Sequence, residues 1–426
     1  MKVLMFGWEF PPFISGGLGT ACYGITKGLL ENDVKVTFVL PTKKGKEITS
    51  PVKILGADEV PLIGDINELM NRIDIINAVS VPSSLSPYAT AVHYSEQLKF
   101  NHSLKVRKDP INSILDFTGD YGDDLLTEVM SYGLVGESLY FYEEFDIIHA
   151  HDWLTYPAGV RTKQISGKPL IVHVHATEFD RSGNNINERV YNIEKYGMEN
   201  ADKVVAVSYY TKNIIINHYG IDQDKIEVVH NAVNKKKQFE RYNIGKNLDD
   251  KIVLFLGRVT MQKGPDYFIE AANLVLKEIE NVRFIMAGSG DLMPEMISRM
   301  AELKIADRFH FTGFLRGLDV ERMYAMSDLY VMPSVSEPFG ITPFEALLYD
   351  VPIIISKQSG VSEILKHAVV VDFWDIQKLA NYIISILKNE DLAQEIVRNC
   401  KEEIQQVEWH SAGNRLKNIY SSVLYY

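Results

Sequence analysis

The sequence predicts an α/β protein with two doubly wound, Rossmann-like domains, each a parallel sheet covered by helices. Short β-branched runs alternate with longer amphipathic segments along most of the chain, as in βαβ units. Several runs are apolar throughout, such as KIVLFLG at 251–257, which suits strands covered on both faces. The length of 426 residues suits two domains at roughly 150 residues or somewhat more each.

The expected strands follow the same rhythm in both halves. In the first half they lie at 2–6, 34–40, 146–150, 169–174 and 203–207. In the second half they lie at 252–256, 282–287, 308–312, 328–332, 352–355 and 368–371. Residues 390–426 have a helical pattern whose simplest role is packing.

The domain boundaries are expected where core-forming residues become sparse. Residues 1–235 form the first domain, with an irregular, proline-interrupted insertion at 43–145. A polar linker at 236–250 follows; its lysines are interpreted as solvated, with a basic recognition tail as the alternative. Residues 251–405 form the second domain, and 406–426 a C-terminal helix.

Charge and cysteine content limit the possible partners and compartment. The 44 basic against 56 acidic residues give a formal charge of −12, which argues against a general nucleic-acid binder. Two cysteines, Cys22 and Cys400, cannot build a disulfide framework, so a cytoplasmic location is expected. The N-terminus suits a first strand better than a signal peptide, and no apolar stretch approaches the roughly 18 residues of a transmembrane segment.

A glycine-rich turn joins the first strand to the first helical segment. Gly16 and Gly17 stand where backbone N–H groups at a helix N-terminus can approach an anion. The pattern is neither Gly-x-Gly-x-x-Gly nor a Walker A loop. A tight turn that only packs the helix on its strand is the alternative interpretation.

Two cations follow strand 252–256. Arg258 and Lys263 stand in the segment GRVTMQKGP at 257–265, at the carboxyl end of a parallel strand, where open α/β sheets bind ligands. Arginine as a fork and lysine as a point charge can neutralise a diphosphate. Solvated surface charge is the alternative for either residue.

A pair of acids follows strand 328–332, in the segment SEPFGITPFEA at 336–346. Glu337 lies in a Pro/Gly loop and Glu345 on the next helix, near the same sheet edge as the two cations. Carboxylates accept sugar hydroxyls, so the pair can hold a ribose and a pyranose; paired acids also occur in glycosidases. The alternative is a capping acid plus an exposed helical glutamate.

Two His-x-His pairs follow strands of the first half. His149, His151 and Asp152 end one strand, and His173 and His175 end the next. Such pairs permit a metal interpretation, but no third ligand type is evident, so hydrogen bonding in a sugar pocket without metal is preferred. His149 and His173 are alternatively buried within the strands.

In this order the motifs resemble the retaining GT-B glycosyltransferases, in particular the glycogen/starch synthase and family-4-type branch (glycosyltransferase group 1) that includes sucrose-phosphate synthases. The resemblance spans nearly the whole chain. It implies the GT-B fold, two Rossmann-like domains that face each other across a cleft. It also implies that the helix at 406–426 crosses back to the first domain.

The resemblance assigns roles residue by residue. Gly16 and Gly17 match a loop that approaches the donor phosphates. Arg258 and Lys263 match the cations that stabilise the departing diphosphate, Glu337 the acid near the donor sugar, and Glu345 the acid on the ribose. The donor-binding set implied is Gly16, Gly17, Arg258, Lys263, Glu337, Gly340, Ile341 and Glu345.

The sugar and acceptor side is implied to consist of His151, Asp152 and His175. In the family, the backbone carbonyl at the position of His175 stabilises positive charge on the anomeric face. The implied catalytic set is His175, Arg258, Lys263 and Glu337, with no metal. No cofactor is expected beyond the co-substrate, a UDP- or ADP-type nucleotide sugar.

Departures from the family pattern bear on the substrate. Ile14 and Ser15 stand where glycogen and starch synthases usually carry a lysine before the glycine pair, and Glu345 is present although some ADP-glucose enzymes lack it. Residues 172–181 look closer to the sucrose-synthase style. These differences favour the broader family-4-type group.

The expected function is retaining transfer of a hexose, with glucose and an α-1,4-glucan acceptor as the leading expectations. The first alternative is transfer to a sugar phosphate or an envelope glycan precursor. Alternatives of other classes are a sugar-nucleotide epimerase and a non-catalytic carbohydrate-binding protein. The sequence does not predict an oligomeric state.

Overall fold

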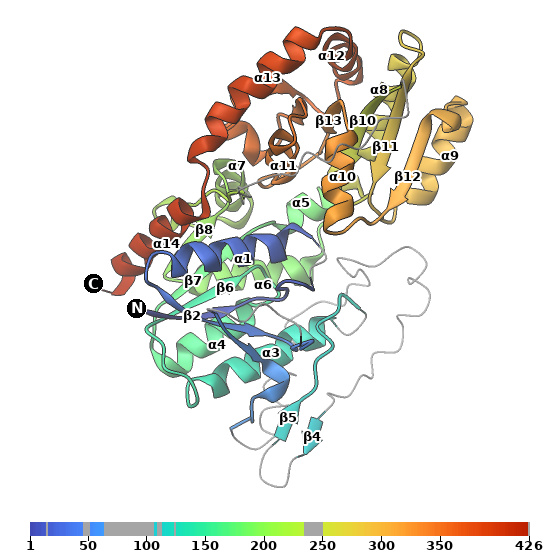
Figure 1. Cartoon of the computed structure of the whole chain (residues 1–426). Helices are drawn as coiled ribbons and strands as arrows, with labels where there is room; N and C mark the ends of the chain where they lie inside the picture. Colours follow the sequence, from blue (N-terminus) through green and yellow to red (C-terminus); the bar gives the residue numbers. More distant parts are fainter. Residues whose placement is uncertain are drawn as a thin grey trace. The chain divides into compact units, whose positions relative to one another are not determined.

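The computed structural model describes residues 1–13, 16–45, 52–63, 106–108, 113–122, 125–233 and 250–424. They form two compact units, coloured along the sequence in Figure 1. Unit 1 comprises Met1–Phe179, Gly183–Ala232 and Trp409–Tyr426, and unit 2 comprises Asp180–Ser182 and Val233–Glu408. Ile14, Ser15, much of the predicted insertion at 43–145 and the predicted linker at 236–250 except Asp250 lie outside the described residues.

Unit 1 contains a seven-stranded sheet in which every pairing is parallel. The strand order is β3-β2-β1-β6-β7-β8-β9. The bounds are β1 Lys2–Phe6, β2 Lys35–Leu40, β3 Lys53–Gly56, β6 Ile147–His151, β7 Leu170–Val174, β8 Lys203–Ala206 and β9 Ile226–Val228. A separate antiparallel hairpin pairs β4 (Val106–Lys108) with β5 (Ser113–Leu115).

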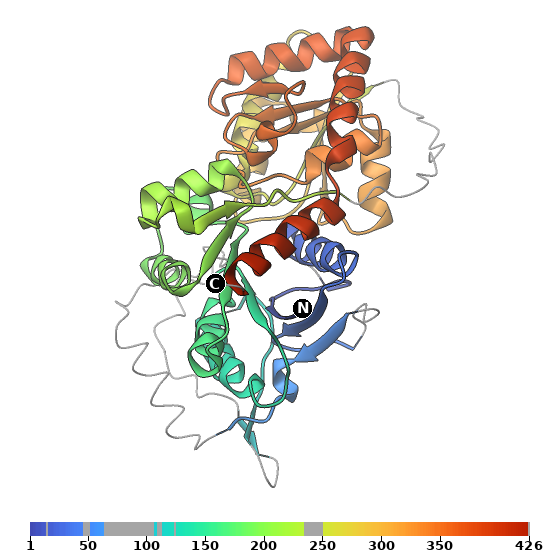
Figure 2. The same cartoon turned by 90° about the vertical axis from the view of Figure 1, so that its left-hand side faces the viewer.

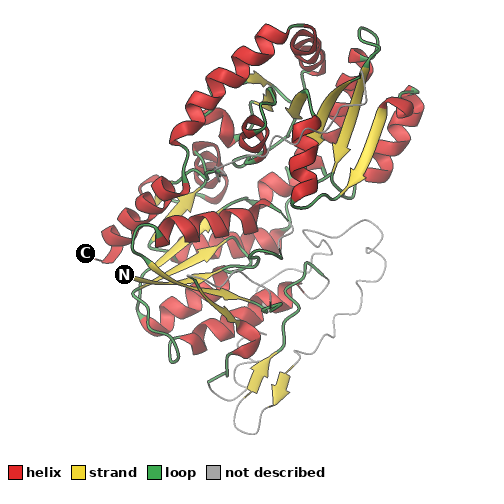
Figure 3. Cartoon of the chain, in the orientation of Figure 1, coloured by secondary structure: helices red, strands yellow, loops and turns green. Residues whose placement is uncertain are grey.

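Helices cover both faces of this sheet, because alternate strand residues are apolar on each side. An apolar core joins one face to α3, α4 and α6 (Figure 3). The other face carries the histidines of β6 and β7 and lies against α1 and α14. The helices are α1 Gly17–Leu30, α3 Leu125–Leu139, α4 Tyr156–Ser166, α6 Glu188–Asn200, α7 Tyr209–Ile214 and α14 Trp409–Leu424. The short helix α5, Glu178–Ser182, begins in unit 1, and its last three residues are assigned to unit 2.

The C-terminal helix α14 packs along α1, although nearly 400 residues separate them in sequence (Figure 2). Glycines permit this close approach. A Cβ added to Gly28 would lie 1.9 Å from the carbonyl oxygen of Trp409, and one added to Gly413 would lie 2.2 Å from the carbonyl carbon of Gly28. The Trp409 indole itself packs over Gly24. Helix α14 therefore belongs to the core of unit 1.

Unit 2 contains a six-stranded parallel sheet with the order β12-β11-β10-β13-β14-β15. Its strands are β10 Lys251–Leu256, β11 Val282–Ala287, β12 Phe309–Gly313, β13 Leu329–Met332, β14 Ile353–Ser356 and β15 Val369–Val371. Its helices are α8 Pro265–Val275, α9 Met293–Leu303, α10 Leu318–Met326, α11 Thr342–Leu348, α12 Ile376–Lys388 and α13 Glu390–Glu403.

The strands that the sequence predicts are all present, each within one residue of its expected ends. The short strands β3 and β9 at the two edges of the first sheet and the β4–β5 hairpin were not predicted. The helical pattern over 390–426 is two helices, α13 and α14, with a break between Glu403 and Trp409. Among the described residues, no helix combines the length and apolar character needed to cross a bilayer.

Candidate active site

The predicted site residues lie where the strand order of each sheet reverses direction. In unit 1 the reversal falls between β1 and β6, and in unit 2 between β10 and β13. Doubly wound sheets bind ligands at the carboxyl ends of the strands at such a point. Gly16 and Asp152 follow β1 and β6, while Arg258 and Glu337 follow β10 and β13.

In unit 2, the structure brings two predicted catalytic residues together. Lys263 Nζ lies 2.5 Å from Glu337 Oε2, and the Ser334 hydroxyl donates to the same oxygen at 3.1 Å. The Glu337 side chain is only 9% exposed and that of Lys263 20% exposed. A carboxylate so far from water needs a charged partner, and Lys263 provides one. The pair places one cation and one anion at the end of β10 and β13.

Arg258 is oriented by a buried glutamine. Its Nη2 donates to Gln262 Oε1 at 3.0 Å. The Gln262 carbonyl oxygen in turn accepts from the backbone N–H of Val335 at 2.9 Å and of Ser336 at 3.4 Å. Gln262 is 3% exposed. It therefore ties the guanidinium to the loop that carries Glu337.

Gly340 lets this loop turn closely around Glu337. Its φ of +98° lies in a region of backbone conformation that residues other than glycine rarely adopt. An added Cβ would lie 3.2 Å from Glu337 Cγ and 3.3 Å from the sulfur of Met332. Ile341, the next predicted donor residue, occupies the N-cap position of α11. Gly340 and Ile341 thus lie in the loop and helix start that directly follow Glu337 in the chain.

Glu345 lies in the first turn of α11 and is held by a buried tyrosine. Tyr324, 1% exposed, donates its hydroxyl to Glu345 Oε2 at 3.1 Å. Burial, together with the charge of Glu345, raises the pKa of Tyr324 well above its usual value, so the phenol stays protonated and remains a donor. Tyr330 donates to Thr342 Oγ1 at 2.7 Å on the same turn. The carboxylate is thereby fixed on a short, well-anchored helix.

In unit 1, Gly16 and Gly17 begin helix α1. Gly16 is the N-cap and makes no side-chain cap, and the first turn carries no acidic residue. Both glycines are exposed, and an added Cβ on either would meet nothing within 4 Å among the described residues. The helix N-terminus therefore presents backbone N–H groups without a competing carboxylate in its first turn.

Asp152 positions the backbone at His175. Its Oδ1 accepts from the His175 N–H at 2.6 Å and from the Ala176 N–H at 3.4 Å. Its own N–H donates to the His173 carbonyl at 2.9 Å. Asp152 has a φ of +59°, a strained conformation for a residue with a side chain. Three hydrogen bonds thus hold the loop after β6 against the loop after β7.

Four histidines stack on one face of β6 and β7. The register pairs His151 with His173, so His149, His151, His173 and His175 all project to the same side. Ring centroids lie 4.3 Å apart for His149 and His151, and 4.4 Å for His173 and His175. The predicted alternative of strand burial is confirmed for His149 and His173, which are fully buried.

Burial lowers the pKa of these imidazoles. It brings the pKa of His149 and of His175 to about 3, with the charge of His175 adding to the effect on His149. The pKa values of His151 and His173 also fall well below the usual range, again through burial first. The rings are therefore neutral at neutral pH and cannot act there as charged acids. What they can offer is hydrogen bonds, or nitrogen lone pairs for a metal.

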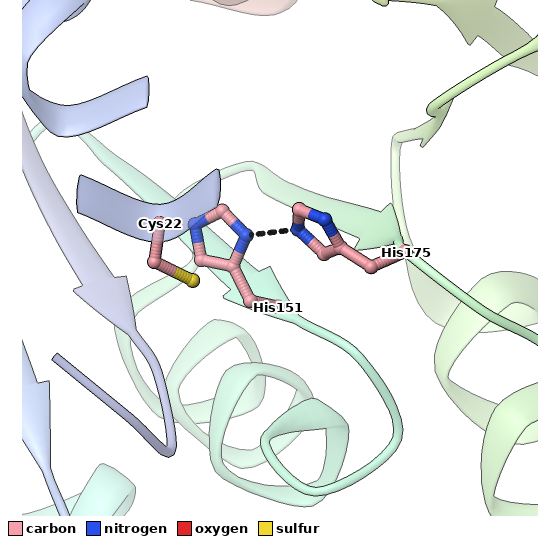
Figure 4. Close-up of side chains that lie close together, drawn as sticks. All are labelled: Cys22, His151 and His175. Carbon is pink, nitrogen blue, oxygen red and sulfur yellow. Dashed lines mark hydrogen bonds between the residues drawn. The ribbon is translucent and has the colours of Figure 1, made fainter. Parts of the chain in front are cut away.

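A third ligand type lies beside two of these histidines. The thiol of Cys22 on α1 lies with nitrogens of His151 and His175 in one group whose ligand atoms are all within 4.8 Å of one another (Figure 4). This corrects the expectation that no third ligand type accompanies the His-x-His pairs. Spacing along the chain did not reveal it, because Cys22 comes from a helix more than 120 residues away.

Several supporting residues were not predicted from the sequence. Gln262, Ser334 and Tyr324 position Arg258, Glu337 and Glu345, respectively. Gln262 lies between Arg258 and Lys263 in the sequence, so its position next to the two cations could have marked it as a residue that supports them. Tyr324 precedes Glu345 by 21 residues and lies on another helix, so no local pattern marks it.

Comparison with known proteins gives consistent matches. The family described as "Glycosyl transferases group 1" matches residues 236–403, and "Glycosyltransferase Family 4" matches residues 134–237, together more than half of the chain. An uncharacterised glycosyltransferase of Methanocaldococcus jannaschii is 28% identical, and the aligned region covers 99% of this chain and 98% of that protein. A glycogen synthase of Mycobacterium tuberculosis is 21% identical, covering 99% and 94%.

Solved structures match over the same length. Sucrose-phosphate synthase of Thermosynechococcus elongatus has a TM-score of 0.72 at 16% identity, covering 99% of this chain and 98% of its own. The Anabaena protein HepE, in complex with UDP and glucose, has a TM-score of 0.67 at 16% identity, covering 99% and 100%. The parallel sheets of seven and six strands and these neighbours identify the GT-B fold. The chain is a glycosyltransferase and belongs to group 1 of these enzymes.

Proposed function

We propose that the chain transfers a hexose, with glucose as the leading candidate, from a UDP- or ADP-type sugar to a carbohydrate acceptor. The observation that carries this proposal is the Lys263–Glu337 pair beside Arg258, at the ligand-binding edge of the second sheet. We further propose that the reaction retains the anomeric configuration and needs no metal. A cytoplasmic enzyme fits this role, because nucleotide sugars are made and used there.

The chemistry requires stabilisation of the leaving group. When the bond from sugar C1 to the diphosphate oxygen breaks, its electron pair remains on the nucleoside diphosphate. The acceptor hydroxyl oxygen bonds to C1 and loses its proton. In this proposal Arg258 and Lys263, each held by a hydrogen bond, supply the positive charge that offsets the charge developing on the diphosphate. Each is already oriented by a partner, so little reorganisation is needed at the moment of transfer.

Glu337 would have two roles in this proposal. Before the donor binds, it neutralises Lys263 at 2.5 Å. Once a diphosphate attracts the lysine, the carboxylate can accept a hydroxyl of the donor sugar. Glu345, held by Tyr324, would accept the two ribose hydroxyls. These assignments divide the site of unit 2 into phosphate, hexose and ribose portions.

His175 would act through its backbone rather than its ring. Its ring is neutral because burial lowers its pKa to about 3, so it does not offer an acid at neutral pH. Its backbone N–H is held by Asp152 at 2.6 Å, which fixes the peptide groups around it. A fixed carbonyl dipole could then stabilise the positive charge that develops on the sugar.

The leading acceptor is an α-1,4-glucan, supported by the full-length similarity to a glycogen synthase. A sugar phosphate is the second candidate, favoured by the structural match to a sucrose-phosphate synthase, which has the higher TM-score of the two structures above, 0.72. Both candidates use the same donor chemistry. They differ in whether the acceptor is a neutral chain or carries a phosphate.

The test is an acceptor panel with the full chain. UDP-glucose and ADP-glucose are each incubated with glycogen, with hexose phosphates, or with no acceptor, in the presence and absence of EDTA. The proposal expects nucleoside diphosphate release that depends on one acceptor class and persists in EDTA. An epimerised donor, or transfer that EDTA abolishes, would overturn it.

A further inference from the structure

A row of aromatic side chains lies at the carboxyl edge of the sheet of unit 2. Tyr267 is in the first turn of α8, which follows β10, and Phe373 and Trp374 lie just after the end of β15. Ring centroids lie 5.0 Å apart for Tyr267 and Phe373, and 4.8 Å apart for Phe373 and Trp374. These three side chains form one connected cluster, called the Trp374 row below.

Trp374 is the one tryptophan of the four in the chain that reaches the surface. It is 57% exposed, whereas Trp8, Trp153 and Trp409 are at most 4% exposed. A single apolar residue in contact with water is ordinary in a folded protein. A connected row of aromatic rings that ends in an exposed indole is different, because it offers a flat apolar ligand a surface for stacking.

The Trp374 row is connected to the proposed donor site at two points. Tyr267 follows Lys263 by four residues, across the loop that begins α8. At the other end, Gln358 joins the two regions: its carbonyl oxygen accepts from the Glu337 N–H at 2.9 Å, and its Nε2 donates to Asp372 Oδ1 at 3.0 Å. The row is therefore attached to both members of the Lys263–Glu337 pair.

Polar groups border the aromatic rings. Tyr267 carries a hydroxyl, Trp374 an indole N–H, and Asp372 a carboxylate that immediately precedes the two rings after β15. A carboxylate has about four acceptor positions, so Asp372 can accept hydrogen bonds beyond the one from Gln358. A pyranose has the matching division of its surface, with C–H groups on the ring faces and hydroxyls around the rim.

We infer that the Trp374 row is a binding surface for a neutral glucan chain, whose pyranose rings stack on the aromatic side chains. The inference rests on the proposed glucan acceptor and adds a second place where unit 2 holds that chain. A chain bound at two places dissociates less readily than one bound at the reacting end alone, because the second contact is intramolecular. The expected effect is therefore on the affinity for long acceptors.

Two other occupants fit the row less well. A second copy of the chain would bury about 800 Å² on each partner in an interface of standard size, and only Trp374 in this row is more than half exposed. An anionic lipid surface attracts basic residues, whereas Asp372 and Asp375 flank the two rings and the whole chain has a formal charge of −12. A neutral chain with many hydroxyls meets neither obstacle.

The first test is acrylamide quenching of tryptophan fluorescence in the full chain. Because the other three tryptophans are buried, the emission that acrylamide quenches should come from Trp374, and Trp374→Phe should remove most of it. Maltoheptaose should protect this emission at concentrations where an equal mass of glucose does not. Emission that maltoheptaose leaves unprotected would overturn the inference, as would protection that grows with protein concentration without sugar, which indicates self-association.

The second test compares variants by electrophoresis in gels that contain glycogen. Trp374→Ala should lose the retardation by glycogen, and Trp374→Tyr should keep part of it because an aromatic ring remains. In transfer assays, KM for glycogen should rise about 3- to 10-fold in Trp374→Ala, with a smaller change in KM for the nucleotide sugar. Equal retardation of Trp374→Ala and the parent would overturn the inference.

The matched control is Phe141→Ala, which removes an aromatic side chain that is 59% exposed in unit 1, between α3 and β6. It should keep the retardation and the KM for glycogen, and circular dichroism checks that each variant is folded. Binding and transfer are measured independently. Protection by maltoheptaose without diphosphate release would count against the proposed function alone, whereas glycogen-dependent release without protection would count against this inference alone.

Discussion

The Lys263–Glu337 pair allows stability and catalysis to be separated by a double-mutant cycle. Lys263→Met removes the cation beside the Glu337 carboxylate, which is 9% exposed, and leaves it the hydrogen bond from the Ser334 hydroxyl. Breaking a fully buried pair costs about 3–5 kcal/mol, but Lys263 is 20% exposed, so about 2 kcal/mol of unfolding free energy is expected. Glu337→Gln should cost about 1 kcal/mol, because the lysine can turn to water.

The double variant should cost about 1.5 kcal/mol, because the stranded charge is gone, which gives a coupling of about 1.5 kcal/mol. Activity should behave differently. If Lys263 stabilises the departing diphosphate, its loss removes about 2–5 kcal/mol of transition-state stabilisation, or about 30- to 5,000-fold in kcat/KM. Replacing Glu337 as well should not restore it.

The assays are urea unfolding of all four proteins and initial rates of acceptor-dependent diphosphate release. Lys251→Met is the matched control. Lys251 is the first residue of β10, the strand that precedes Lys263, and its exposed Nζ lies 3.7 Å from Asp328 Oδ1. It should change neither stability nor rate by more than about 1 kcal/mol. A Lys263→Met enzyme within threefold of the parent would refute the role of this lysine in transfer.

The remaining predictions concern positioning, acid stability and helix packing. Tyr324→Phe should raise KM for the donor severalfold with little change in kcat, because it releases Glu345; an unchanged KM would show that the hydrogen bond has no role in donor binding. The unfolding free energy of the protein should fall as pH drops from about 6.5 toward 3. His149 and His175 have a pKa of about 3 in the folded protein, so over this range they take up protons only when the chain unfolds. By pH 5 this difference lowers the unfolding free energy by about 2 kcal/mol per ring. A urea midpoint that stays constant over this range would contradict the prediction. Gly28→Ala should lower the thermal midpoint clearly, since its Cβ would lie 1.9 Å from the backbone of α14, and an unchanged midpoint would mean that the two helices shift apart at no cost.

Most of the fold could be predicted because its strands are buried on both faces. Central strands such as β10 and β13 contain continuous apolar runs that follow charged residues, which marks where they begin. The edge strands β3 and β9 have only four and three residues and carry no such run. Amphipathic spacing continues on both sides of the break between α13 and α14, and the boundary expected at 405–406 falls within that break.

The site was predictable where chemistry is concentrated in short segments after strands. Arg258, Lys263 and Glu337 follow neighbouring strands, and parallel topology brings such residues to one edge. Residues contributed by distant elements could not be predicted this way. Cys22 reaches the histidines, and Tyr324 reaches Glu345, only through tertiary packing that no local spacing encodes.

The most direct test of the central claim is the anomeric configuration of the transferred sugar, read by proton NMR. The full chain is incubated in EDTA with an α-linked nucleotide glucose and the acceptor that the panel selects, and Lys263→Met is run alongside. The account predicts a new α-glycosidic linkage with one nucleoside diphosphate released per linkage, and a rate at least about 30-fold lower in the variant. A β-linkage, donor consumption without a new linkage, or equal rates for the two proteins would contradict it.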